Sequence, residues 1–229
     1  MVVPIQTPAM AEALAAYPPP YRFTANVGWF PATGDAGVVA AALERNVVAF
    51  RGRALLAVIA AEYTAIRCGP GSALAIDGEG RPYRYREVAW LGINPFGVRQ
   101  QIRFGQLCVD APTPLPMALG DSYGFPKASA SVAIGGRSAS AGTAPGPRVA
   151  LAWRRVCGIP ATLVRLSPGA VVSFAKTGVL ATMGVTSARS ASVVRVTEWD
   201  TSLAGVDLRS IGWGVTLSDA EIHLGAPRP

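Results

Sequence analysis

The sequence contains few of the residues that most often bind metal ions or form hydrolytic triads. Its 229 residues include one histidine, His223, and three cysteines, Cys68, Cys108 and Cys157, with no CxxC pair. A zinc site of the usual ligands or a histidine-based triad would have to form around His223 alone, so we expect neither. The odd number and wide spacing of the cysteines indicate buried thiols in a reducing compartment rather than a disulfide framework.

The chain also lacks a hydrophobic run long enough to cross a bilayer. The run ALLAVIAA at 54–61 is among its longest, and a membrane helix needs roughly 20 apolar residues. The beginning of the chain, MVVPIQTPAM, has no basic segment followed by an apolar one, which argues against a secretory signal. We therefore expect a cytoplasmic protein with no membrane partner.

Charged residues are scarce, at 15% of the chain, whereas 50% of the residues are apolar. This composition excludes a disordered chain and permits one substantial core, so we expect a single domain over residues 1–229. The net charge is +7, yet the arginines are scattered one or two at a time without a dense basic run. We interpret them as a solvated surface that attracts small anions, and we expect no nucleic-acid partner.

The pattern of apolar runs and turn residues is typical of a mainly β protein. The proline-rich residues 1–33 predict an extended N-terminal arm, after which Asp35 is expected to cap a short helix over 36–45. From Val47 onward, short runs rich in Val, Ala, Thr and Tyr alternate with Gly, Pro, Asp and Ser, as in a β-sandwich or β-barrel. The predicted strands are 47–52, 54–67, 83–92, 98–109, 127–134, 148–156, 161–166, 169–176, 192–199 and 212–217.

Two of these strands carry polar side chains that deserve a functional interpretation. In the strand 83–92, the period of two places Tyr83, Tyr85 and Glu87 on one face and Trp90 on the other. The polar face either lies in water or forms a cluster inside a barrel. Lys127, one of two lysines among 21 basic residues, begins the strand 127–134, with Ser129 and Ser131 on its face. It is either an ordinary lysine that reaches solvent at the strand entrance or an amine beside a space lined by small groups.

Several segments resemble the acetoacetate decarboxylase-like superfamily. GFPK at 124–127, preceded by the acid-containing turn LGDSY at 119–123, is similar to the Schiff-base lysine motif G-R-E-x-x-G-[FY]-P-K. YRE at 85–87 resembles the family's Y-x-E, and its distance from Lys127 is close to the family's spacing. VDAPTPLPMALGD at 109–121 and YRF at 21–23 resemble the connecting segment and the entry of the N-terminal arm. The resemblance covers roughly residues 17–135.

The resemblance implies a fold and a set of site residues. The fold is a mainly β, cone-shaped barrel with a surrounding sheet and a few short helices. The resemblance implies Lys127 as the nucleophilic amine and Glu87 as the acid or base beside it, with no cofactor, a small keto acid as substrate, and a homo-oligomer. We add Tyr85, Tyr83, Asp121, Arg103 and Phe125 as candidate substrate-binding or supporting residues.

The chain departs from the family pattern at positions that carry charge. Ala128 stands where decarboxylases usually have a second lysine, and Gly120 and Asp121 replace the Arg and Glu of the motif. An arginine of the N-terminal arm that assists the substrate carboxylate corresponds to Asn26. Burial must therefore supply the neutral amine that a nucleophilic lysine requires. Acetoacetate decarboxylase is itself a standard example of such activation.

The sequence leaves three functions open. A lysine imine is an electron sink, which permits decarboxylation of a β-keto acid, and this is the first expectation. The same intermediate permits aldol addition with dehydration, or cyclisation, of an α-keto acid in a natural-product pathway. The third alternative is a non-catalytic barrel that binds a small ligand or serves assembly, with a vestigial lysine.

Overall fold

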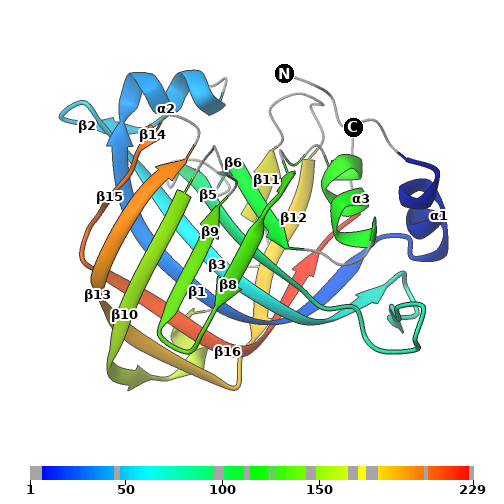
Figure 1. Cartoon of the computed structure of the whole chain (residues 1–229). Helices are drawn as coiled ribbons and strands as arrows, with labels where there is room; N and C mark the ends of the chain where they lie inside the picture. Colours follow the sequence, from blue (N-terminus) through cyan, green and yellow to red (C-terminus); the bar gives the residue numbers. More distant parts are fainter. Residues whose placement is uncertain are drawn as a thin grey trace.

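The computed structural model describes residues 7–43, 47–94, 101–110, 114–123, 125, 127–142, 148–164, 170–173, 180–203 and 206–226. The chain is mainly β, with strands of one 16-stranded sheet and three α-helices among these residues (Figure 1). The helices are α1 (Pro8–Ala16), α2 (Ala36–Leu43) and α3 (Pro114–Tyr123). The long strands are β1 (Tyr21–Asp35), β3 (Arg53–Cys68), β5 (Tyr85–Asn94), β6 (Gln101–Asp110), β10 (Arg148–Ile159), β13 (Ser190–Leu203) and β16 (Trp213–Leu224).

The shorter elements complete the sheet. They are β2 (Ala49–Phe50), β4 (Ala73–Leu74), β7 (Lys127–Ser129), β8 (Ser131–Ile134), β9 (Ser138–Gly142), a 3₁₀ turn η1 (Ala161–Val164), β11 (Ala170–Ser173), β12 (Leu180–Ser187), β14 (Val206–Asp207) and β15 (Arg209–Ser210).

A ring of strands closes on itself and forms the barrel. In order around the ring, β1, β3, β5, β6, β11, β12 and β16 are hydrogen-bonded neighbours, and β16 pairs back to β1. The β6–β11 pair is parallel and the other neighbours in the ring are antiparallel. Register shifts in β1, at Thr24/Ala25 against β3 and at Ala25/Val27 against β16, bend this strand, as β-bulges commonly do in barrels. The prediction of a mainly β barrel is confirmed.

A second layer covers the outside of part of this ring. β16 continues through β13, β10, β9 and β8, and these strands pass in front of β1 and β3 in Figure 1. The strands beneath therefore have two buried faces: Ala57 and Leu91 belong to the core inside the barrel, whereas Val58 and Trp90 belong to the core between the layers. Two apolar faces explain the nearly continuous hydrophobic run in β3.

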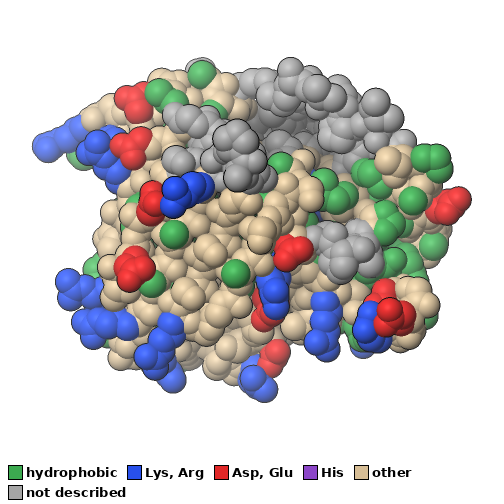
Figure 2. All heavy atoms as spheres, in the orientation of Figure 1, with side chains coloured by type: hydrophobic (Ala, Val, Ile, Leu, Met, Phe, Trp, Pro, Cys, Tyr) green, Lys and Arg blue, Asp and Glu red, His purple; other side chains and the backbone are tan. Residues whose placement is uncertain are grey.

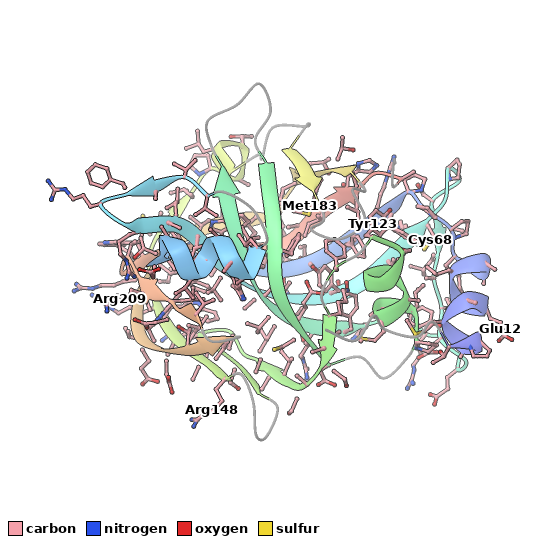
Figure 3. The ribbon with its side chains drawn as sticks, turned by 90° about the horizontal axis from the view of Figure 1, so that it is seen from above. Glu12, Cys68, Tyr123, Arg148, Met183 and Arg209 are labelled. Carbon is pink, nitrogen blue, oxygen red and sulfur yellow. The ribbon has the colours of Figure 1, made fainter. Side chains whose placement is uncertain are left out.

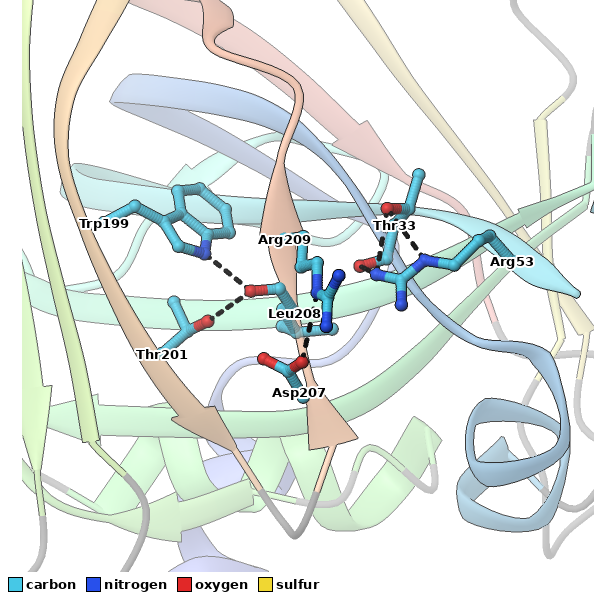
Figure 4. Close-up of polar contacts among 7 residues, drawn as sticks. All are labelled: Thr33, Arg53, Trp199, Thr201, Asp207, Leu208 and Arg209. Carbon is cyan, nitrogen blue, oxygen red and sulfur yellow. Dashed lines mark hydrogen bonds and ion pairs between the residues drawn. The ribbon is translucent and has the colours of Figure 1, made fainter.

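The far end of the second core is fastened by side chains that bind backbone oxygens (Figure 4). The Trp199 Nε1 and the Thr201 hydroxyl donate to the carbonyl of Leu208 at 2.7 and 3.0 Å. Arg53 on β3 donates from one guanidinium nitrogen to the carbonyl of Thr33 on β1 at 3.0 Å. The first two bonds hold the connection from β13 to β15 against β13. β15 then pairs with β1, so the connection is joined to the end of the barrel that lies away from α3.

The structure confirms some predicted elements and corrects others. The helix after Asp35 is present as α2, and the Asp35 carboxylate accepts a hydrogen bond from the Val38 amide at 3.0 Å. Residues 1–33 were predicted to form an extended arm, but α1 and most of β1 occupy the larger part of this segment. Likewise, the turn predicted at 119–123 is the second half of α3, and the strand predicted at 161–166 begins as the turn η1.

The strand predicted over 127–134 is divided at Ala130 into β7 and β8. Ser129 and Ser131 are exposed while the Lys127 side chain is buried. The prediction that small groups on this face line a space beside the lysine is therefore wrong, because both serines face solvent and line neither cavity.

The surface carries its charges in a mixed distribution. On the face in Figure 2, basic and acidic side chains lie close to one another around the lower edge. Ion pairs such as Arg148–Asp200 and Arg209–Asp207 are largely exposed to solvent. Within the described residues, no helix is both long and apolar enough to span a membrane.

Candidate active site

The centre of the candidate site is a buried ion pair between Lys127 and Glu87. The Lys127 Nζ lies 3.1 Å from the Glu87 Oε2, and the two side chains are only 6% and 7% exposed. β7 and β5 both pair with β6, where Lys127 stands beside Leu107 and Glu87 beside Val109. The alternation of β5 directs Glu87 inward together with Tyr85 and Ala89, so the polar face of this strand is inside the barrel and not in water.

Helix α3 holds the lysine from the other side. The Lys127 Nζ donates to the carbonyl of Pro116 at 3.0 Å, which is an oxygen in the first turn of the helix. Gly120, one helical turn later, packs on the stem of the lysine, since a Cβ added there would lie 2.5 Å from Lys127 Cδ and 2.7 Å from Cγ. At this position, where the family motif has an arginine, an added Cβ would force the lysine stem to shift. The α3 backbone and Glu87 together fix where the amine points.

Aromatic rings enclose the amine. The Nζ lies 5.3 Å from the centroid of the Tyr85 ring and 5.8 Å from that of Phe125. Tyr85 stacks on Tyr63 of β3 with centroids 4.3 Å apart, and Phe125 meets Phe104 of β6 edge to face at 4.9 Å. These rings exclude water from the ion pair.

The phenols beside Glu87 are held in their neutral form. Burial, followed by the negative charge of Glu87, raises the pKa of Tyr63 well above its usual value. The pKa of Tyr85 is also raised well above that value, by burial first and then by Tyr63 and Glu87. Since both groups keep their protons at neutral pH, they are available as hydrogen-bond donors rather than as bases.

Two adjoining cavities open from this pair into the barrel. The smaller, of about 40 Å³, is lined by Lys127, Tyr85 and Phe125 among others. The larger, of about 190 Å³, extends towards Trp29, Ile59 and Val215. Both are lined by the side chains Tyr63, Glu87, Phe104, Met183 and Ile222.

The wall of the cavities near α3 is closed by the chain's C-terminal strand. Met183 of β12 pairs with Leu224 of β16, and the next residue, Gly225, accepts a hydrogen bond from the Tyr123 hydroxyl at 2.8 Å. Figure 3 shows Met183 and Tyr123 at this end of the barrel, beside α3. The last turn of α3 is thereby tied to the strand that lines the cavities.

The remaining predicted site residues have different positions. Tyr83 is buried, but it packs edge to face on Tyr17, the residue after α1, with centroids 5.7 Å apart and lines neither cavity. The backbone of Asp121 lies in α3 and that of Arg103 in β6 beside Gly92. The side chains of Asp121 and Arg103 lie outside the described part of the structure, as do Gly124 and Pro126 of the motif.

Some residues of the site were not predicted from the sequence. Tyr63 and Phe104 line both cavities, and Tyr63 could have been found from the alternation of β3, which it shares with Ala57 and Ile59. Asn26, expected at the place of a substrate-binding arginine, instead accepts a hydrogen bond from the Asp219 amide at 3.2 Å and lines neither cavity. It fastens β1 to β16 at the bulge.

Comparison with solved structures identifies the fold as that of acetoacetate decarboxylase-like proteins. A structure of acetoacetate decarboxylase is similar over 93% of this chain and 89% of that chain, with a TM-score of 0.62 and 12% identity. The enduracididine biosynthesis enzyme MppR, complexed with the condensation product of pyruvate and imidazole 4-carboxaldehyde, is similar over 92% of this chain and 89% of that chain, with a TM-score of 0.60 and 18% identity. An acetoacetate decarboxylase-like enzyme from Sphingomonas wittichii RW1 covers 91% of each chain at a TM-score of 0.60 and 16% identity.

No protein-family model matches the chain, and no curated protein matches it. The similarity to the solved structures spans almost the whole chain at low identity. The resemblance inferred from a few motifs is therefore confirmed at the level of the fold.

Proposed function

We propose that this barrel is a Schiff-base-forming lyase that decarboxylates a small β-keto acid through Lys127. The observation that carries the proposal is the enclosed amine that lines the smaller of two adjoining cavities, 3.1 Å from a carboxylate that lines both. A lysine with a purely structural role at the surface would not require a cavity beside its amine. Groups of this kind in a concave pocket are typical of functional sites.

The first half of the reaction uses the lysine as nucleophile. A lysine attacks a carbonyl only as the free amine, and the Glu87 carboxylate, with Oε2 3.1 Å away, is placed to take its proton. The amine adds to the ketone and water leaves, so that a C=N bond replaces the C=O bond and the iminium carries the positive charge. The bond between the α-carbon and the carboxylate then breaks, CO₂ departs, and the electron pair moves through the α-carbon to the iminium nitrogen.

The second half restores the enzyme. Glu87 gave the proton of the lysine to the departing water, so it takes a new proton from solvent and delivers it to the α-carbon of the enamine. Water then hydrolyses the resulting iminium to the ketone and free Lys127. The sum is one β-keto carboxylate and one proton converted to one ketone and CO₂. The iminium is the electron sink, so these steps use no further cofactor.

An aldol reaction with dehydration is the second candidate. The MppR structure that shares this fold contains the condensation product of pyruvate and imidazole 4-carboxaldehyde. The same Lys127 and Glu87 would support it here, because an iminium also acidifies the neighbouring C–H. Release of CO₂ from β-keto acids separates the two candidates, since the aldol reaction joins pyruvate to an aldehyde and releases water.

Borohydride trapping tests the proposal directly. The protein is reduced in the presence of acetoacetate or pyruvate, digested, and searched for the adduct by mass spectrometry. The chain has only two lysines, Lys127 and Lys176, so the assignment is simple. We expect the adduct on Lys127, its loss in Lys127→Arg, and its retention in Lys176→Arg. A wild-type protein that gives no adduct with a broad panel of keto acids is instead a binding barrel.

The homo-oligomer remains an expectation from the resemblance. Light scattering of the purified chain measures it, and a monomer at working concentration contradicts it.

A further inference from the structure

We infer that the substrate carries an uncharged, apolar substituent on its reacting carbonyl, and that this substituent occupies the larger cavity. The inference rests on the proposed Schiff-base function and adds the class of substrate. For the decarboxylation it specifies a β-keto acid with an alkyl chain or an aromatic ring in place of the methyl group of acetoacetate.

The position of the larger cavity gives the first argument. Glu87, Tyr63 and Phe104 line both cavities, so a molecule bonded to Lys127 Nζ extends from the small space past these side chains into the larger one. The small space, of about 40 Å³, accepts the reacting carbons only. Whatever else the substrate carries has to enter the larger cavity.

The lining of the larger cavity gives the second argument. Most of its described residues are aliphatic or aromatic: Val27, Trp29, Ile59, Val215, Leu217 and Ile222. Glu87 is its only charged residue among those described, and Lys127 already pairs with it. A second carboxylate or a phosphate at the far end of a substrate would be buried without a cation to pair with, which is strongly unfavourable.

The size of the cavity gives the third argument. Its volume is about 190 Å³, and an apolar protein cavity of roughly 150 Å³ stays dry and binds benzene. The space therefore fits a phenyl ring or a short alkyl chain. Each methylene that moves from water into such a space contributes about fourfold in binding. Acetoacetate, with a methyl group only, leaves this contribution unused.

A series of four β-keto acids tests the inference with the wild-type protein. Acetoacetate, β-ketohexanoate and benzoylacetate differ in apolar bulk, and β-ketoadipate has the chain of β-ketohexanoate with a terminal carboxylate in place of the methyl group. We expect kcat/KM for CO₂ release to be at least about tenfold higher for β-ketohexanoate and benzoylacetate than for acetoacetate. We expect β-ketoadipate to be worse than acetoacetate.

A matched pair of variants on β12 locates the substituent. Val185 lines the larger cavity, whereas its neighbour Thr186 is exposed. Val185→Phe fills part of the cavity and should lower kcat/KM for benzoylacetate at least about tenfold more than for acetoacetate. Thr186→Phe adds the same bulk to the outside and should leave the ratio between the two substrates unchanged. Circular dichroism and the Tm of both variants show whether they fold.

The outcomes separate the inference from the proposed function. Equal or lower activity on the two apolar substrates, or equal activity on β-ketoadipate and β-ketohexanoate, overturns the substrate class while acetoacetate trapping still supports the Schiff base. Absence of a borohydride adduct with all four compounds overturns the Schiff-base function and the substrate class with it.

Discussion

At the scale of single residues, the Lys127–Glu87 pair combines two charges in a place where water is excluded. Burying such a pair is a cost that the attraction between its members does not reliably offset. Here the pair also has the Pro116 carbonyl as a partner for the amine and two neutral phenols near the carboxylate. The arrangement keeps an amine and a proton acceptor in contact, which is what imine chemistry needs and what an apolar core would not supply.

Glu87→Gln should separate imine formation from proton transfer. Glutamine has the same shape and accepts no proton, so borohydride trapping on Lys127 should persist while kcat falls by about a hundredfold to ten-thousandfold. Stopped-flow measurement of CO₂ release gives kcat, and the yield of the trapped adduct gives the extent of imine formation. A variant with undiminished kcat would show that Glu87 does not transfer the proton.

Gly120→Ala tests the packing of α3 on the lysine. An alanine in a helix interior is normally stabilising relative to glycine by up to about 1 kcal/mol. At Gly120 the new Cβ would lie 2.5 Å from Lys127 Cδ, so we expect destabilisation of about 1–3 kcal/mol and a loss of kcat/KM of at least about tenfold.

Gly37→Ala is the matched control for this variant. Gly37 lies in α2, and the nearest atom to its added Cβ is Asp35 Oδ1 at 3.4 Å. It should be neutral or slightly stabilising and leave activity unchanged. Urea unfolding measures the stability of both variants, and steady-state kinetics measure their activity. Equal behaviour of the two would mean that Lys127 moves freely aside.

At the scale of elements, the single strand β5 contributes residues to the candidate site and to both cores. Tyr85 and Glu87 face the barrel interior, and Val88 and Trp90 face the second core. A sheet with layers on both sides positions its inward residues more rigidly than a loop would, since neither face is free to relax into water. The catalytic candidates thus stand on elements rather than on connections.

Asp35→Ala should weaken α2 without affecting the site. The substitution removes the hydrogen bond from the Val38 amide, and loss of an N-cap costs about 0.5–2 kcal/mol. Val39 and Leu43 of this helix pack in the second core, away from Lys127. Urea unfolding should show the loss while the kcat of the purified variant stays at the wild-type value. A large fall in kcat would indicate that a change in the second core alters the geometry of the active site.

At the scale of the whole molecule, buried tyrosines lower the stability at alkaline pH. Burial raises the pKa of Tyr21 and Tyr123 above the usual value of 10.0, and it raises the pKa values of Tyr63 and Tyr85 as well. The folded protein therefore keeps phenolic protons that the unfolded chain releases. The stabilisation is complete below pH ~10 and declines as the pH rises above it, by about 1.4 kcal/mol per pH unit for each such group.

Tyr21→Phe should reveal one of these contributions. Its hydroxyl donates to the Tyr17 carbonyl at 2.9 Å, so the variant should be less stable than wild type by about 1 kcal/mol near neutral pH. By pH ~11 the difference should disappear or reverse, because phenylalanine has no proton to lose. Urea unfolding at both pH values measures it. A difference that stays constant with pH would contradict the predicted titration.

The sequence pattern determined the mainly β class, and the resemblance carried by a few motifs pointed to Lys127 and Glu87. Alternation in 83–92 predicted that Tyr85 and Glu87 share a face, and the motif around 124–127 singled out Lys127, because both signals are local and survive in any β structure. Asp35 and the helix that follows it were likewise readable, since capping depends on neighbours in the chain.

Only the tertiary structure decided what surrounds these residues. The β3–β5 pairing brings Tyr63 against Tyr85, and the packing before β7 brings Phe125 against Phe104. Residues of β3 and β16 line one cavity, and such contacts depend on the arrangement of distant segments rather than on local pattern. Closure of the ring made β1 part of the barrel where an arm was predicted, and α3 packs so closely on Lys127 that a Cβ added at 120 would force the lysine stem to shift. The shape and apolar lining of the cavity are therefore properties of the assembled barrel, because each wall comes from a different part of the chain.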